Sequence, residues 1–128
     1  MAGPGTLLLV DDDPDIRRVA TLSLERIGGW RVVAVGSGAE AVARAADLQP
    51  TGILLDVMMP GLDGPTTLTR LRENPRTRAL PVIFMTARIQ PSEVARYHAM
   101  GVRGVLSKPF DPLALPGEVS ALLDAAAL

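Results

Sequence analysis

Five short apolar runs, each followed by a segment of helical pattern, constrain the fold of this chain most strongly. The runs are continuously apolar rather than alternating, which is typical of parallel strands covered on both faces. Strands that alternate with helices predict an α/β fold built from right-handed crossovers. For five such units, the compact doubly wound parallel sheet has the order 2-1-3-4-5. The predicted strands cover residues 6–10, 31–35, 52–56, 80–86 and 102–106.

Residues that start and stop helices mark the segments between these strands. Asp13 before Pro14 has the residue types of an N-cap and a first helical position, and Ser37 with Glu40 has the spacing of a capping box. The five predicted helices cover residues 14–27, 37–48, 65–73, 91–100 and 111–126. An apolar stripe runs along the first one: Ile16, Val19, Ala20, Leu22, Leu24 and Ile27. Pro116 predicts a delayed start of the last helix, because proline fits only the first turn.

The bulk properties exclude several classes of protein. A chain of 128 residues suits one domain, and we expect residues 1–128 to form it, with a core at about 6–124. Because cysteine is absent, disulfides and thiolate metal sites are excluded. A net charge of −1 gives no reason to expect direct nucleic-acid binding. No apolar run approaches the ~20 residues of a membrane helix, and the N-terminus lacks a signal-peptide pattern. We therefore expect a cytoplasmic protein without membrane contact.

Polar side chains stand at the ends of four predicted strands. Asp11 and Asp12 follow the first strand, Asp56 ends the third, Thr86 ends the fourth, and Lys108 follows the fifth. In the doubly wound order these strand ends meet at one rim, beside the switch point between strands 1 and 3. Two carboxylates at 4 Å repel each other by about 4 kcal/mol at an effective dielectric of 20. Such a cluster either takes up protons or recruits a cation. Oxygen ligands alone predict Mg²⁺, with Mn²⁺ and Ca²⁺ as alternatives.

These side chains fit phosphoryl transfer. Asp56 can attack phosphorus as a carboxylate nucleophile and form an aspartyl phosphate. Lys108 supplies positive charge, and the Thr86 hydroxyl can donate to a phosphoryl oxygen. A bound Mg²⁺ offsets charge on the equatorial oxygens. No separate base is needed, because an ordinary carboxylate is already ionised at neutral pH.

Four motifs together resemble the receiver domain of response regulators in two-component signalling, of the chemotaxis-regulator kind. They are VDDDP at 10–14, LDVMMPGLDG at 55–64, MTA at 85–87 and SKPF at 107–110. The resemblance extends over about residues 7–123 and implies a flavodoxin-like receiver fold. It implies that Asp56 is the phosphoacceptor and that Thr86 and Lys108 bind the phosphoryl group. It assigns Mg²⁺ to Asp11, Asp12, Asp56 and the backbone carbonyl of Met58, with Asp12 as the direct ligand of the acidic pair.

The resemblance also implies partners. A histidine kinase or phosphotransfer protein would charge Asp56, and a downstream protein would read the phosphorylated state. The domain would be a monomer or a weak phosphorylation-dependent dimer. It would be no enzyme beyond its own phosphotransfer and dephosphorylation. The bond between Lys108 and Pro109 is expected to be cis, as is frequent in the family at this position.

One position departs from the family pattern. Receivers often carry Tyr or Phe three residues before the lysine, and that ring moves inward when the threonine hydroxyl moves. Here the residue is Val105. We therefore expect a shift of Thr86 to be read through the loop after the fourth strand and through helix 91–100. Met58 and Arg88 occupy positions that tune phosphoryl lifetime, and the apolar Met58 predicts slow self-hydrolysis.

Other functions are compatible with parts of the pattern. A phosphorylation-independent pseudo-receiver scaffold is favoured only by Val105. A Mg²⁺-dependent phosphatase with an aspartyl nucleophile would carry a second Asp where Met58 stands. Asp13 and Asp63 fit structural roles as a cap and a turn residue, and His98 fits an exposed helix position. Tyr97 fits either a partner surface or packing, and the pattern does not choose between them.

Overall fold

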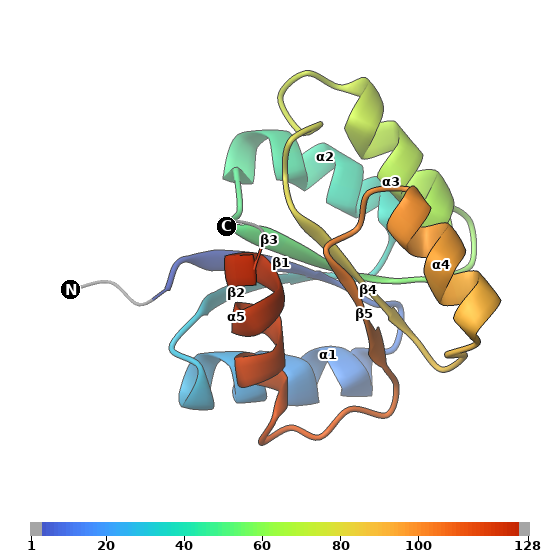
Figure 1. Cartoon of the computed structure of the whole chain (residues 1–128). Helices are drawn as coiled ribbons and strands as arrows, with labels where there is room; N and C mark the ends of the chain where they lie inside the picture. Colours follow the sequence, from blue (N-terminus) through green and yellow to red (C-terminus); the bar gives the residue numbers. More distant parts are fainter. Residues whose placement is uncertain (1–3, 126–128) are drawn as a thin grey trace.

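The computed structural model describes residues 4–125, which form one five-stranded parallel sheet between two layers of helices (Figure 1). The strands are β1 (Thr6–Val10), β2 (Arg31–Val35), β3 (Gly52–Asp56), β4 (Val82–Thr86) and β5 (Gly104–Ser107). Their order is β2-β1-β3-β4-β5, with every neighbouring pair parallel. The doubly wound order predicted from the apolar runs is therefore confirmed. None of the helices in the described part is long and apolar enough to cross a membrane.

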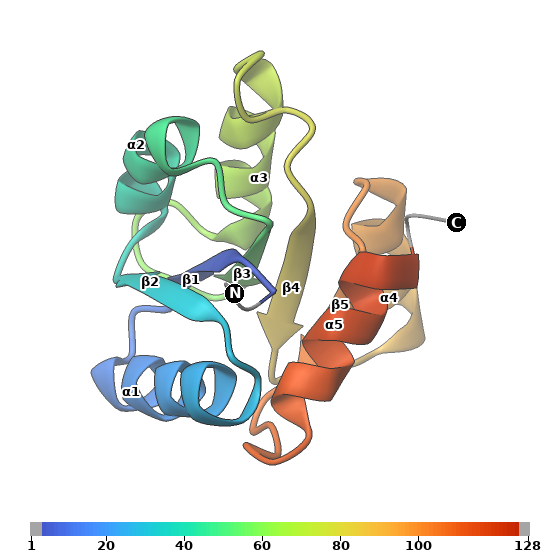
Figure 2. The ribbon, with the colours of Figure 1, turned by 90° about the vertical axis from the view of Figure 1, so that its left-hand side faces the viewer.

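The helices cover both faces of the sheet. They are α1 (Pro14–Leu22) with a π-helical turn η1 (Ser23–Ile27), α2 (Gly38–Leu48), α3 (Gly64–Glu73), α4 (Pro91–Ala99) and α5 (Leu115–Ala125). Figures 1 and 2 show α1 and α5 on one face, and α2, α3 and α4 on the other. Each face has its own apolar core: Leu7, Leu9 and Leu54 point to the α1 side, and Leu8 and Leu55 to the α2 side. This division follows from the alternation of side chains along a strand.

Helix boundaries follow the capping residues read from the sequence. The Asp13 carboxylate accepts hydrogen bonds from the amides of Asp15 and Ile16, and Ser37 accepts from Glu40. The helix α5 begins at Leu115 rather than at the predicted residue 111, so that Pro116 lies in its first turn, consistent with the delayed start that this proline suggested. The predicted end at Ala126 lies outside the described residues. The strand predicted at 102–106 is instead observed at Gly104–Ser107. The Arg103 amide already donates to the carbonyl of Val82 in β4, just before the ladder begins.

The first helix differs from its predicted form. Ala20 and Leu24, four residues apart, face the sheet and are fully buried, whereas Leu22 and Ile27 are largely exposed. Leu22 points roughly 200° away from Ala20 around the helix axis, so it cannot face the same core. The last turn is π-helical, with the amide of Gly28 donating to the carbonyl of Ser23. The apolar stripe is thus divided between a buried face and an exposed one.

Candidate functional site

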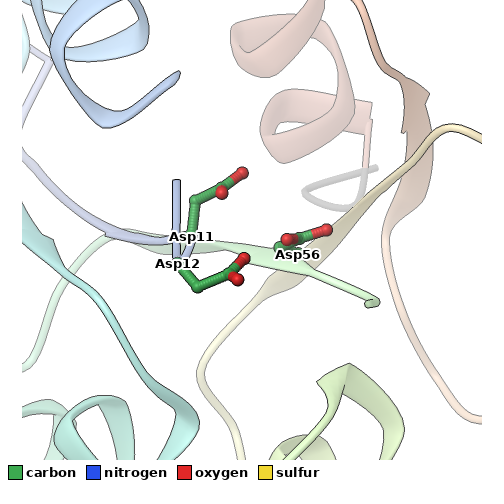
Figure 3. A group of neighbouring side chains, drawn as sticks. All are labelled: Asp11, Asp12 and Asp56. Carbon is green, nitrogen blue, oxygen red and sulfur yellow. The ribbon is translucent and has the colours of Figure 1, made fainter. Parts of the chain in front are cut away.

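Three carboxylates meet at the carboxyl end of the sheet, where β1 and β3 lie side by side. Asp11 and Asp12 directly follow β1, and Asp56 is the last residue of β3. Figure 3 shows the three side chains gathered at this edge. One oxygen from each carboxylate lies within 4.8 Å of those of the other two. The strand order therefore brings together acids that are far apart in the sequence, as expected for a switch point.

Burial makes this cluster electrostatically costly. Asp11 and Asp56 are buried, whereas Asp12 is exposed. Burial, and secondly the negative charge of Asp11, raise the pKa of the Asp56 carboxyl from 3.8 to about 6, although Lys108 acts in the opposite direction. Any positive charge placed beside Asp56 therefore stabilises its ionised form.

Lys108 supplies part of that charge. Its Nζ atom lies 2.9 Å from Oδ2 of Asp11 and 3.3 Å from Oδ1 of Asp56. Burial opposes the charged ammonium, but the hydrogen bond to Asp11 and the charge of Asp56 outweigh it and raise the pKa of Lys108. The Lys108 amide donates to the carbonyl of Thr86, which ties the end of β5 to β4. The expected cis bond between Lys108 and Pro109 is present.

Thr86 ends β4 and is buried at the same edge of the sheet. Its strand neighbour Met85 pairs with Asp56, so Thr86 lies one residue beyond the acid on the adjacent strand. The hydroxyl accepts a hydrogen bond from the amide of Arg88, 3.1 Å away. A hydroxyl has one proton to donate and two lone pairs, so Thr86 retains donor capacity.

The turn after β3 holds the rim in shape. The Asp63 carboxylate caps α3 by accepting from the Thr66 amide, which agrees with the structural role expected for it. The Gly64 amide donates to the carbonyl of Val57. A Cβ atom on Gly64 would lie 2.8 Å from the carbonyl oxygen of Asp56, so only glycine lets α3 start this close to the strand. The sequence indicated a turn at Asp63 and Gly64 but not this contact.

Met58 lies beside the acids with its side chain in solvent, 66% exposed. Its amide is 3.4 Å from Oδ1 of Asp56, a long hydrogen bond to the acid. The roles predicted for the Met58 carbonyl and for slow self-hydrolysis remain predictions.

The donor set fits a hard cation. All three side chains offer carboxylate oxygens, and the ammonium of Lys108 balances only part of their charge. Mg²⁺ binds such sites through a few carboxylates and retains several waters. The residues present therefore fit the magnesium that the sequence predicted.

An apolar surface adjoins the rim, and sequence reasoning did not identify it. A groove between α1 and the segment after β5 is lined by Ile16, Val19, Lys108, Pro109 and Phe110, together with Asp15. A second groove continues along the same helix over Val19, Leu22, Ile27 and Pro112, with Ser23 and Arg26. The signal that could have identified it was the width of the apolar stripe on the first helix, which is too wide for one buried face.

Comparison with known proteins gives one consistent answer. A family model described as the response regulator receiver domain matches residues 7–120. The response regulator Rre1 of Synechocystis sp. is 39% identical over 96% of this chain and 53% of its own length. The protein PilH of Pseudomonas aeruginosa is 33% identical over 91% of this chain and 96% of its own. The solved structure of the chemotaxis response regulator CheY4 of Vibrio cholerae superposes with a TM-score of 0.85 at 29% identity, covering 95% of this chain and 98% of that one. The chain thus spans about half the length of some curated relatives and nearly all of others.

Proposed function

The chain belongs to the response regulator receiver domain family of two-component signalling, and from this membership we propose that Asp56 accepts a phosphoryl group from a phosphohistidine on a partner protein. Residues 6–124 would act as one receiver unit. The phosphorylated form would then change its affinity for a downstream protein. Receivers of this family are regulatory domains rather than stand-alone enzymes.

One observation carries the proposal. The Nζ atom of Lys108 bridges Asp11 and Asp56, at 2.9 and 3.3 Å, and Asp12 completes an acidic cluster around them. A nucleophilic carboxylate, a fixed cation beside it and a further pair of acids are the parts that phosphoryl transfer to an aspartate requires. Salt bridges that serve stability alone would not leave a surplus of buried negative charge at one strand end.

The transfer forms one bond at phosphorus and breaks another. An Oδ atom of Asp56 forms a bond to phosphorus, the bond from phosphorus to the donor's imidazole nitrogen breaks, and the imidazole leaves with the electron pair. Lys108 and the hydroxyl of Thr86 would then contact the phosphoryl oxygens. A Mg²⁺ held by Asp11, Asp12, Asp56 and the Met58 carbonyl would supply positive charge to the same oxygens.

The apolar grooves beside the acidic edge support a docking site for the protein that donates the phosphoryl group. Val19 lies on both grooves, and the first groove includes Lys108, so a protein seated there would reach the phosphoacceptor edge. Contiguous exposed apolar side chains are a feature of protein contact sites. We propose that the histidine-bearing donor binds over α1 and the segment after β5.

The test is incubation with acetyl phosphate and Mg²⁺, followed by intact mass measurement. We expect a single phosphate adduct on the wild-type protein and none on Asp56→Asn. Asp63→Asn is the matched control, because it makes the same change at an acid of the same turn and keeps a side-chain oxygen for the helix cap. That variant should be phosphorylated like the wild type.

A wild-type protein that takes up no phosphate in the presence of Mg²⁺ would contradict the proposal and favour a phosphorylation-independent scaffold. An adduct that persists on Asp56→Asn would place the acceptor elsewhere. Release of phosphate within seconds would count against the slow self-hydrolysis predicted for Met58.

A further inference from the structure

A closed ring of contacts connects Thr86 with the buried face of α4. The Arg88 amide donates to the Thr86 hydroxyl at 3.1 Å. The Arg88 guanidinium lies 3.9 Å from Oε1 of Glu93, in the first turn of α4. The hydroxyl of Tyr97, one helical turn later, donates to Oε2 of the same carboxylate at 3.4 Å. Glu93 therefore connects the loop that follows Thr86 to Tyr97, whose side chain is buried between α4 and the sheet.

Tyr97 completes the ring by returning to β4. It is the buried residue of α4, 2% exposed, and its ring stands edge-on to Phe84 with the centroids 5.1 Å apart. Phe84 lies two residues before Thr86 on the same strand, and its partner on β5 is Val105. Val105 is only partly buried against this core. The aromatic contact in this region thus comes from α4, beside a small residue on β5.

The polar steps of this ring are weak enough to rearrange. Arg88 is mostly exposed and its ion pair is long, so that pair contributes little to stability. The Tyr97 hydrogen bond is also longer than the usual range for an O–H···O bond. The packing of the Tyr97 ring against Phe84 is by contrast fully buried. A small shift of the loop between β4 and α4 can therefore change the partner of the Tyr97 hydroxyl without unfolding α4.

We propose that Tyr97 transmits the state of Asp56 to α4 in this chain, through Arg88 and Glu93; this inference rests on the proposed phosphorylation of Asp56. When Thr86 turns its hydroxyl toward a phosphoryl group, the Arg88 amide loses its acceptor. The loop then shifts Arg88 relative to Glu93, and the carboxylate no longer holds the Tyr97 hydroxyl in place. Tyr97 acts as a positioning residue and touches no reacting atom.

The sequence allows a direct test, because Tyr97 is the only tyrosine. A sample labelled with ¹³C on the tyrosine ring and on the methionine methyl groups reports two places at once. Met58, two residues from Asp56, reports binding at the acidic site, and Tyr97 reports α4. On addition of Mg²⁺ and beryllofluoride, a phosphoryl mimic, we expect both NMR signals to shift in the wild-type protein.

Two variants separate coupling from general disturbance. Glu93→Gln should keep the Met58 shift and lose most of the Tyr97 shift. Asp47→Asn removes an acid from another exposed ion pair, with Arg76 on the surface, and should respond like the wild type. A Tyr97 signal that stays fixed while Met58 moves would overturn the relay alone, as would a full Tyr97 response in Glu93→Gln. A Met58 signal that does not move would instead contradict phosphoryl binding at Asp56, and the relay with it.

Discussion

The helices α1 and α4 lie on opposite faces of the sheet (Figure 1) and differ in how far their large apolar side chains are exposed. On α1 and the following π-helical turn, Val19, Leu22 and Ile27 are 43%, 47% and 54% exposed. On α4 the large ring of Tyr97 is 2% exposed and packs on Phe84. The first helix and its π-helical turn leave these apolar side chains exposed, whereas α4 packs its large apolar side chain against the sheet. Our two proposals accordingly place docking of the phosphoryl donor and readout of the phosphoryl group on different faces.

Substitutions on α4 and on α1 should differ most in their effect on the free energy of unfolding. Tyr97→Ala should lower the free energy of unfolding by about 3–5 kcal/mol, because it removes a buried aromatic ring from a packed core. Leu22→Ala should change it by no more than about 0.5 kcal/mol, since that side chain is already largely in solvent. Urea denaturation followed by circular dichroism measures both. Similar losses in the two variants would mean that α1 buries its apolar side chains after all.

The acidic rim between the two helices should respond to pH. In the absence of divalent cations, Asp56→Asn should raise the free energy of unfolding at pH 7.5 by up to about 3 kcal/mol, because a pKa of about 6 instead of 3.8 penalises the ionised carboxyl in the folded protein. The folded state binds the extra proton as the pH falls through 6, so the wild type gains stability there. The advantage of Asp56→Asn should therefore disappear near pH 4.

Urea denaturation at the two pH values, in EDTA, measures this difference. Asp63→Asn serves as the control and should behave like the wild type at both. An advantage of Asp56→Asn that grows toward low pH would show that the carboxyl is stabilised, not penalised, by its surroundings.

The exposed face of α1 can be tested separately from α4. Val19→Glu should lower the rate of phosphotransfer from a phosphohistidine-bearing donor protein by ten- to a hundred-fold, about 1.4–2.7 kcal/mol, because it places a charge in an apolar contact. Phosphorylation by acetyl phosphate should be unchanged, since that small donor needs no docking surface. His98→Glu, at an exposed position of α4, is the control and should leave both rates as they are. A loss with acetyl phosphate would indicate damage to the site itself.

The smallest expected effect concerns the loop that joins the rim to α4. Arg88→Ala should change the free energy of unfolding by less than about 0.5 kcal/mol, because it removes only a long, exposed ion pair. Arg76→Ala, which removes the comparable surface pair with Asp47, should do the same. Only the Arg88 variant should reduce the Tyr97 response to beryllofluoride. A loss of stability well above that of Arg76→Ala would assign Arg88 a structural role.

Much of the fold was predictable because its signals are local. Continuous apolar runs predicted the five strands, and Asp13, Ser37 and Pro116 predicted where helices begin. The order of the strands followed from topology rules that apply to any chain of this pattern. Those rules also predicted that Asp11, Asp56, Thr86 and Lys108 would lie at one edge, since the carboxyl ends of parallel strands share an edge.

The remaining features depend on which side chains come into contact. The division of the α1 stripe required knowing that Ala20 and Leu24 share the face toward the sheet, and the π-helical turn has no sequence signal that we recognise. The tight approach of Gly64 to Asp56 arises where a helix start meets a strand end. The position of Tyr97 in the helical pattern did not decide whether its side chain is buried or exposed.

By itself the sequence determined the strands, the caps and the set of residues at the strand ends, because these depend on periodicity and on residue type. Only the tertiary structure decided that Lys108 contacts both Asp11 and Asp56, that the apolar face of α1 stays open, and that Tyr97 packs on Phe84. Asp11 and Lys108 are 97 residues apart in the chain. A distance of 2.9 Å between their charged groups depends on the register and twist of the whole sheet, which no local stretch of sequence contains.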